Sequence, residues 1–204
     1  MSYPQKQTVQ SANTVRIDSQ VAATLRYIRG TMEAASSIAV PGSAASDMGI
    51  VGLLAAVLSS TAGLREHWLG IWLLAAAVAA SLGIALMARP SSLRGLRLSA
   101  TPVRKFALCL IPSMFAGAVM TAVHWSAGNL HAIPGTWLLL YGCALVAASV
   151  PATGTLAVMG GLFTSLGLLA LVLPDNLQTL MLGTGFGGLH MLFGLLIGRA
   201  DHGR

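Results

Sequence analysis

The stretch WLGIWLLAAAVAASLGIALMA, residues 68–88, contains no charged side chain and determines what kind of protein this is. The hydrocarbon core of a bilayer is about 30 Å thick, so a helix needs about 20 consecutive, mostly apolar residues to cross it. In the whole chain 55% of the residues are hydrophobic and 9% are charged, whereas a soluble domain has about 25% charged residues. The sequence therefore predicts an integral membrane protein.

Six apolar segments follow one another along the chain, and they predict an all-α membrane protein with six transmembrane helices. The expected spans are Met48–Gly63, Trp68–Ala88, Phe106–Val123, Thr136–Val150, Thr155–Leu173 and Leu177–Gly198. The turn between the fourth and fifth spans, 151–154, carries no charge. Residues 136–173 therefore fit either two full spans or a re-entrant hairpin.

Apolar residues at helical spacing precede the first span and form a single stripe. Its members are Val21, Leu25, Ile28, Met32, Ala35 and Ile38. Arg26, Arg29 and Glu33 lie off the stripe, which is typical of an amphipathic helix ended by Pro41-Gly42. Such a helix lies either in the cytoplasmic membrane interface or against the protein's own underside.

The positive charges predict how the chain is oriented. There are 12 Lys and Arg against 6 Asp and Glu, a net charge of +6. With the N-terminus inside, eleven of the twelve basic residues fall in inner segments and only Arg65 falls outside, as the positive-inside rule requires. Basic residues are not interleaved with aromatic ones as in a nucleic-acid module. We expect both termini in the cytoplasm, membrane lipids as partners, and no nucleic acid.

The segment RPSSLRGLRLSATPVRK, between the second and third spans, has five basic residues and no acidic one. They are Arg89, Arg94, Arg97, Arg104 and Lys105. Such a cluster attracts anionic lipid by about 1 kcal/mol per residue, and it would equally receive an acidic partner. It either contacts lipid or a partner in this way or only fixes the orientation.

Three pairs of similar segments predict an inverted repeat of three plus three helices. AVPGSAASDMG (39–49) resembles AIPGTWLLLYG (132–142), SLGIALMARP (81–90) resembles SLGLLALVLP (165–174), and SMFAGAVM (113–120) resembles TGFGGLHM (184–191). Because three is odd, the second copy would enter the membrane from the opposite side. The expected divisions are a cytoplasmic tail with the amphipathic helix (1–42), a first repeat (43–131), and a second repeat with a short cytoplasmic tail (132–204). The repeat forms either a transport site between its halves or an inert bundle.

The last span, GTGFGGLHMLFGLLIG (183–198), places an ionisable residue near the centre of the bilayer. On a regular helix, glycines at 183, 187, 194 and 198 share one stripe with His190, which predicts a groove of small residues around an imidazole. An imidazole at that depth has to face protein or water. It would serve as a proton relay, a solute contact or a haem ligand, or as a neutral group that hydrogen-bonds two helices together. The candidate residues for helix packing or solute contact are Gly183, Gly187, His190, Gly194 and Gly198.

Several imidazole and carboxylate groups fall in the expected outer loops. They are Glu66, His67, His124 and His131. These groups suit zinc or copper, so they are candidate metal ligands. The pairs His67-Trp68 and His124-Trp125 are equally explained as interfacial residues near lipid headgroups, and we predict no cofactor.

Two motifs carry a resemblance to known sequences. PGTWLLLYG (134–142) followed by GFGGLHMLFG (185–194) resembles an uncharacterised group of small bacterial multipass inner-membrane proteins with PGxWLLLYG and GFGGLHxxFG elements. The likeness covers mainly residues 26–49 and 133–198. It implies a bacterial inner (plasma) membrane location and brings no activity.

Two non-enzymatic functions fit the sequence best, and an enzyme with a metal held by His67, His124 and His131 is the third hypothesis. The first is an accessory, assembly or regulatory subunit of a membrane complex, because nearly uncharged spans rich in Gly and Ala suit helix packing. The second is a small oligomeric carrier or channel for a neutral or anionic solute, which would use the repeat interface near His190. In both cases we expect a protein partner, or further copies of the chain, in the membrane.

Overall fold

The computed structural model describes residues 20–21, 23–27, 42–88, 101–149 and 154–202. The chain forms two compact units, Met1–Ser37 and Ile38–Arg204. In the first unit, residues 20–21 and 23–27 are helical, and the rest of the expected amphipathic helix lies outside the described residues. The apolar segments all belong to the second unit.

The second unit has six helices that are long and apolar enough to cross a membrane. Five of them are α2 (Gly42–Ser60), α3 (Trp68–Ala88), α4 (Thr101–Ser126), α5 (Ala132–Ser149) and α6 (Gly154–Val172). The sixth consists of α7 (Gln178–Leu182), a π-helical segment η3 (Gly183–Leu189) and α8 (His190–His202). The short 3-10 turns η1 (Arg65–His67) and η2 (Asp175–Leu177) precede α3 and α7. The predicted all-α architecture with six membrane-length helices is confirmed.

The first and fourth helices are longer than the sequence pattern predicted. α2 begins at Gly42 and has 19 residues, and α5 begins at Ala132 and has 18. Pro134 lies in the first turn of α5, where its missing N–H has no intrahelical acceptor to lose, so the helix runs through it. The expected starts at Met48 and Thr136 therefore lie too far along the chain, and in α5 the tolerated proline is the reason. In this part of the chain α5 and α6 are each long and apolar enough to cross a membrane, which supports two full spans over a re-entrant hairpin.

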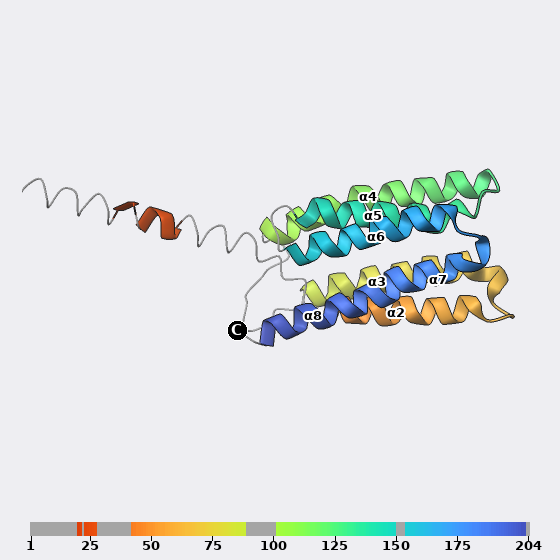
Figure 1. Ribbon diagram of the computed structural model, residues 1–204, viewed down its shortest axis with the longest axis horizontal. Coiled ribbons are helices and arrows are strands. Elements are labelled where there is room, and N and C mark those ends of the chain that lie inside the picture. The colour runs from red at the N-terminus through yellow and green to blue at the C-terminus, as the bar shows by residue number, and fades with distance from the viewer. Residues whose placement is uncertain (1–19, 22, 28–41, 89–100, 150–153, 203–204) are drawn as a thin grey trace, which may run out of the picture. The chain divides into compact units, whose positions relative to one another are not determined.

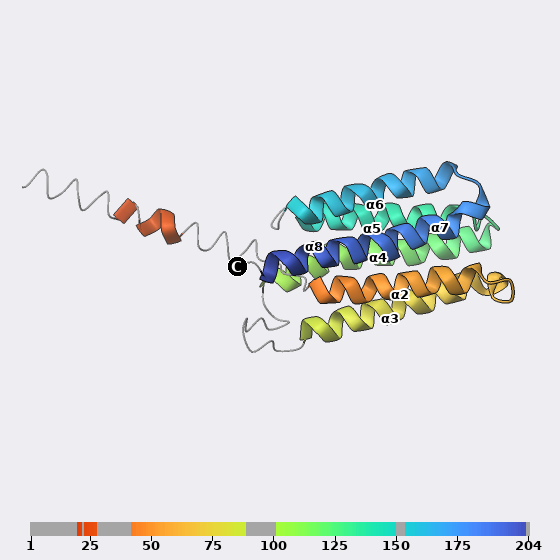
Figure 2. The same cartoon turned by 60° about the horizontal axis from the view of Figure 1, so that its bottom comes forward.

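The helices of the second unit form two groups of three (Figure 1). In one group α5 packs against α4 and α6, and in the other α2 packs against α3 and along η3 and α8. The rotated view in Figure 2 shows the sixth helix running between α2 and the α5–α6 pair. There α7 contacts α5 and η3 contacts α6, so the sixth helix joins the two groups.

Glycines bring α5 and α6 to direct backbone contact. A Cβ built at Gly160 would lie 2.8 Å from the carbonyl oxygen of Gly142, and one built at Gly167 would lie 3.0 Å from that of Gly135. The two glycines in each helix are seven positions apart, or two turns, so both face the partner helix. A larger side chain at these positions would have to push the two backbones apart.

The same arrangement recurs between α2 and the sixth helix. A Cβ built at Gly49 would lie 3.0 Å from the carbonyl oxygen of Gly187, and one built at Gly194 would lie 2.8 Å from that of Gly42. We refer to these two sets of contacts, α5–α6 and α2–α8, as the glycine ladders. They give a structural role to the shared glycines of AVPGSAASDMG and AIPGTWLLLYG, which form one side of each ladder.

The helix pairs that form the two glycine ladders are not the pairs that a simple duplication of three helices would predict. An ordered three-plus-three repeat makes α4 the equivalent of α8, so α5 would form its ladder with α4. The structure forms that ladder with α6 instead. The inverted repeat therefore stays a prediction.

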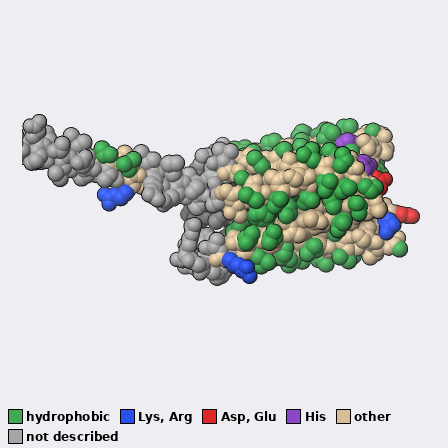
Figure 3. Space-filling view, in the orientation of Figure 1, with side chains coloured by type: hydrophobic (Ala, Val, Ile, Leu, Met, Phe, Trp, Pro, Cys, Tyr) green, Lys and Arg blue, Asp and Glu red, His purple; other side chains and the backbone are tan. Residues whose placement is uncertain are grey.

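Helices α3 and α4 lie on the outside of the unit. In their most apolar stretches 11% of the residues are buried, against 56% in α5. Figure 3 shows hydrophobic side chains over most of the visible face of the helices, with acidic and histidine side chains gathered at one end. This distribution suits a protein whose sides meet lipid and whose ends meet water.

The course of the chain through the six helices predicts which loops a reagent can reach from each side of the membrane. Gly63 and Asn129 lie in connections at one end of the unit, whereas Gly154 begins α6 at the other end. In a chain whose free Cys109 and Cys143 are replaced by Ala, we expect an impermeant maleimide added outside cells to label Gly63→Cys and Asn129→Cys. Gly154→Cys should react only after permeabilisation. Labelling of Asn129→Cys and Gly154→Cys from the same side would contradict the crossing of α5.

Candidate functional site

The buried imidazole of His190 makes a specific polar contact inside the helix bundle. His190 is 4% exposed, and its Nε2 lies 2.8 Å from the phenolic oxygen of Tyr141 in α5. The backbone carbonyls of Gly185 and Phe186 lie near the ring, but Nδ1 has no partner with hydrogen-bond geometry among the described residues. The pair therefore links the sixth helix to α5, which is the arrangement expected of a neutral, helix-joining histidine.

Two phenylalanine rings lie against this hydrogen-bonded pair. The ring of Phe163 in α6 meets the imidazole edge-on at 5.3 Å between centroids, and Phe186 lies nearly parallel to it at 6.2 Å. Phe163 also meets the ring of Tyr141 at 4.9 Å. Aromatic groups thus border the polar pair, and its shared hydrogen bond satisfies Nε2 of His190 and the hydroxyl of Tyr141 but not Nδ1.

The glycines of the sixth helix and His190 contact different helices. Gly187 and Gly194 face α2 in the ladder, Gly183 lies against Ala56, and the backbone of Gly198 lies against Gly42. His190 instead contacts Tyr141 of α5.

A cavity of about 390 Å³ lies beside the polar pair, between α2, α3, α4, α5 and the sixth helix. Its polar or amphipathic lining residues are Trp72, Ser113, Thr121, Trp137, Tyr141 and His190. The rest of the lining is apolar, and no Asp, Glu, Lys or Arg contributes to it. Every lining residue belongs to a helix, so the cavity lies at membrane depth rather than among the connecting loops.

The cavity opens toward the side of the bundle. Leu73 of α3 and Met114 of α4 line its opposite walls, and they are 48% and 44% exposed. Both residues lie in the membrane-length part of their helices. The cavity is therefore bordered by exposed residues of α3 and α4 in the apolar part of the bundle.

Two residues that line this cavity have a buried polar atom without a partner among the described residues, His190 at Nδ1 and Trp72 at its indole nitrogen. Trp72 is 3% exposed, and its indole Nε1–H has no acceptor among the described residues. The neighbouring Trp137 differs, since its Nε1–H donates to Thr121 Oγ1 at 2.7 Å. Trp72 lies in the second turn of α3, and the centroid of its ring is 6.3 Å from that of Phe186 in the sixth helix.

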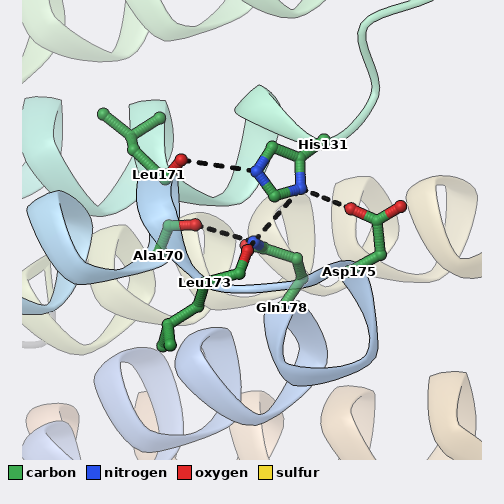
Figure 4. A network of polar contacts seen from close by, with 6 residues as sticks. All are labelled: His131, Ala170, Leu171, Leu173, Asp175 and Gln178. Atoms are coloured by element: carbon green, nitrogen blue, oxygen red, sulfur yellow. Dashed lines mark hydrogen bonds and ion pairs between the residues drawn. The ribbon is translucent and has the colours of Figure 1, made fainter.

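The connection between α6 and α7 is held by a separate polar network (Figure 4). Gln178 Nε2 donates to the carbonyl oxygens of Ala170 and Leu173, at 2.7 and 3.1 Å. His131 pairs through Nδ1 with the carboxylate of Asp175. These contacts satisfy carbonyl groups that the end of α6 leaves free and tie the start of α5 to the same loop.

The candidate metal ligands are not brought together. His124 Nε2 lies 3.3 Å from Thr136 Oγ1, and Glu66 and His67 are exposed on η1. No group of three or more His, Cys, Asp or Glu side chains in the described part of the chain could hold a metal ion. His131 is engaged with Asp175 instead.

The basic cluster can be placed only in part. Arg89, Arg94 and Arg97 lie outside the described residues. Arg104 and Lys105 belong to the first turns of α4, and their side chains are likewise outside the described part. Contact of this cluster with lipid or partner therefore stays a prediction.

The sequence pattern identified His190 as a candidate site residue, but it identified neither Tyr141 nor Trp72, which lie beside it on the cavity wall. Tyr141 stands in the middle of an apolar span, and a buried tyrosine hydroxyl usually needs a partner. That was the available signal for Tyr141. Nothing in the sequence indicates that Trp72 faces inward.

Comparison of the chain with protein-family models, curated proteins and solved structures finds no match. The resemblance to small bacterial inner-membrane proteins therefore stays a prediction. Function has to be inferred from the site itself.

The hydrogen bond between His190 and Tyr141 can be measured by a double-mutant cycle. We expect Tyr141→Phe and His190→Gln to lower the free energy of unfolding less than additively, with a coupling of about 0.5–1.5 kcal/mol, the range of side-chain hydrogen bonds in membrane proteins. The measurement is reversible unfolding in mixed micelles. Strictly additive losses would show that the two side chains do not interact.

Proposed function

We propose that this chain is a non-enzymatic membrane protein that binds a small membrane-soluble ligand and acts as an accessory or regulatory subunit of a membrane complex. The observation that carries the proposal is the sideways-opening cavity of about 390 Å³ beside His190 and Tyr141. Pockets for small molecules have volumes of about 300–1,000 Å³ and combine apolar walls with a few placed polar groups. This cavity has both properties.

The lining favours a neutral ligand over a charged one. A charged solute that enters an apolar cavity loses its hydration, and only an opposite charge or several hydrogen bonds compensate for the loss. The lining residues offer neither a carboxylate nor a permanent cation. The sequence left both neutral and anionic solutes open, and the lining favours a neutral one.

The same helices connect ligand binding to a partner. α3 and α4 form opposite walls of the cavity and also carry the least buried stretches of the unit. A second membrane protein, or a further copy of the chain, would pack on these exposed faces. A ligand in the cavity would then change the surface of α3 and α4 that the partner contacts. In this way ligand binding would alter the interaction with the partner.

The expected setting is a bacterial inner membrane with both termini in the cytoplasm. The distribution of basic residues supports the orientation. The basic segment 89–105 would lie at the inner surface, where it can bind anionic lipid or an acidic partner.

A small oligomeric carrier is the second candidate, and the position of the polar pair on the cavity wall favours it. A carrier must expose its site to both sides of the membrane in turn. Uptake of a neutral solute into proteoliposomes, lost in His190→Ala, would support the carrier over the accessory subunit.

Filling the cavity tests the main proposal. A Cβ at Gly117 would lie 3.8 Å from Leu140 Cδ1, so there is room for a side chain to enter the cavity. We expect Gly117→Leu to reduce the amount of co-purified membrane-soluble small molecule by about tenfold or more, because a clash of about 1.4 kcal/mol has that effect on affinity. Mass spectrometry of extracts from the purified protein measures it.

The matched control is Gly70→Leu, which adds the same side chain to α3 at an open position away from the cavity. It should leave the bound molecule unchanged. Equal contents of bound molecule in the wild type, Gly117→Leu and Gly70→Leu would refute ligand binding in this cavity.

A further inference from the structure

The cavity beside His190 presents carbon to a ligand, although polar residues belong to its lining. Trp137 Nε1–H donates to Thr121 Oγ1 at 2.7 Å, and the Thr121 hydroxyl donates to the carbonyl oxygen of Gly117, also at 2.7 Å. The hydroxyl oxygen of Tyr141 lies 2.8 Å from Nε2 of His190. Because these groups form their hydrogen bonds within the protein, they do not call for a polar partner on a bound molecule.

The two buried nitrogen atoms without a partner do not change this chemistry. Nε1 of Trp72 and Nδ1 of His190 have almost no accessible surface, so a molecule in the cavity does not reach them. Ser113 supplies the remaining hydroxyl of the lining, and nearly all of the accessible wall is apolar. A polar or charged group would lose its hydration there without compensation. The lining therefore selects a hydrocarbon.

The cavity is elongated along the helices. Its lining runs from Trp72 to Ala80 in α3 and from Leu110 to Thr121 in α4. At the rise of an α-helix, these stretches are about 12 Å and about 16 Å long. One leaflet supplies half of the hydrocarbon core, or about 15 Å of its depth. The lining thus matches one lipid chain in both length and chemistry, rather than a compact solute.

From these features we infer that the ligand is a hydrocarbon chain of a bilayer lipid, which lies lengthwise in the cavity while its headgroup stays outside. The chain lies against Ala76 of α3, Gly117 of α4 and Leu140 of α5. Leu73 and Met114, which are 48% and 44% exposed, border the side where the cavity is open. Recognition therefore depends on the chain and not on the headgroup. The inference rests on the proposed function, because it names the class of ligand for the same cavity.

Two photoreactive lipids test this arrangement. One phosphatidylethanolamine carries a diazirine near the middle of an acyl chain, and the other carries it on the headgroup amine. Each is illuminated in nanodiscs with the full-length protein, and peptide mass spectrometry identifies the crosslinked residues. We expect the chain probe to label Leu140 and Tyr141 in the cavity, and the headgroup probe to label them at least about tenfold less. Val158 and Leu168 of α6, which are 59% and 58% exposed and do not line the cavity, report lipid around the protein.

Matched variants test whether the labelled chain lies in the cavity. Gly117→Leu fills the cavity from α4, and Ala76→Leu fills it from α3. Each should lower labelling of Leu140 by the chain probe about tenfold and leave labelling of Val158 unchanged. Ala77→Leu adds the same side chain at the neighbouring exposed position, which does not line the cavity, and it should change neither. Elution volume and melting temperature verify that each variant is folded, and the comparison of the two probes in the wild type depends on no variant.

Three results would overturn the lipid-chain inference. They are labelling of Val158 by the chain probe without labelling of Leu140 or Tyr141, equal labelling of Leu140 by the two probes, and labelling of Leu140 that survives both cavity-filling variants. The co-purification experiment decides the proposed function separately. A bound molecule that is not a lipid and is lost in Gly117→Leu would overturn the inference and leave the cavity as a ligand site.

Discussion

Direct backbone contact at glycine is the constraint on which the rest of this structure depends. Lipid tails are as apolar as leucine, so helices in a bilayer gain little by hiding apolar side chains from their surroundings and associate through close packing and polar contacts instead. The two ladders supply that packing for α2 with the sixth helix and for α5 with α6. The sixth helix joins these pairs through α7, η3 and the bond from His190 to Tyr141.

The cavity is a consequence of the same arrangement. Because α2 and α5 use their glycine faces for the ladders, α3 and α4 pack against other faces of these two helices and stay largely exposed. They stand on opposite sides of the aromatic cluster without closing over it. A cavity therefore arises where the tightly packed core ends, and its polar and amphipathic lining residues come from α3, α4, α5 and the sixth helix.

The sequence predicts the six membrane-length helices well because the apolar length of each segment determines them directly. Helix starts are predicted less well, since Pro134 looks like an interruption and is tolerated in a first turn. His190 could be found because an ionisable group in an apolar span stands out, whereas the inward orientation of Trp72 depends on tertiary packing that periodicity does not contain. The histidines of the expected outer loops illustrate the same limit, because lying on one side of a membrane does not make side chains converge.

A glycine-to-alanine scan of unfolding free energies tests the central role of the ladders most directly. The ladder positions are Gly42, Gly49, Gly135, Gly142, Gly160, Gly167, Gly187 and Gly194, and the outward-facing controls are Gly70, Gly161 and Gly188. Each ladder variant should lose about 1–3 kcal/mol, because the added methyl group meets backbone, while the controls should change by less than about 0.5 kcal/mol or gain stability from the better helix former. Losses at Gly161 and Gly188 as large as those at their neighbours Gly160 and Gly187 would contradict the account.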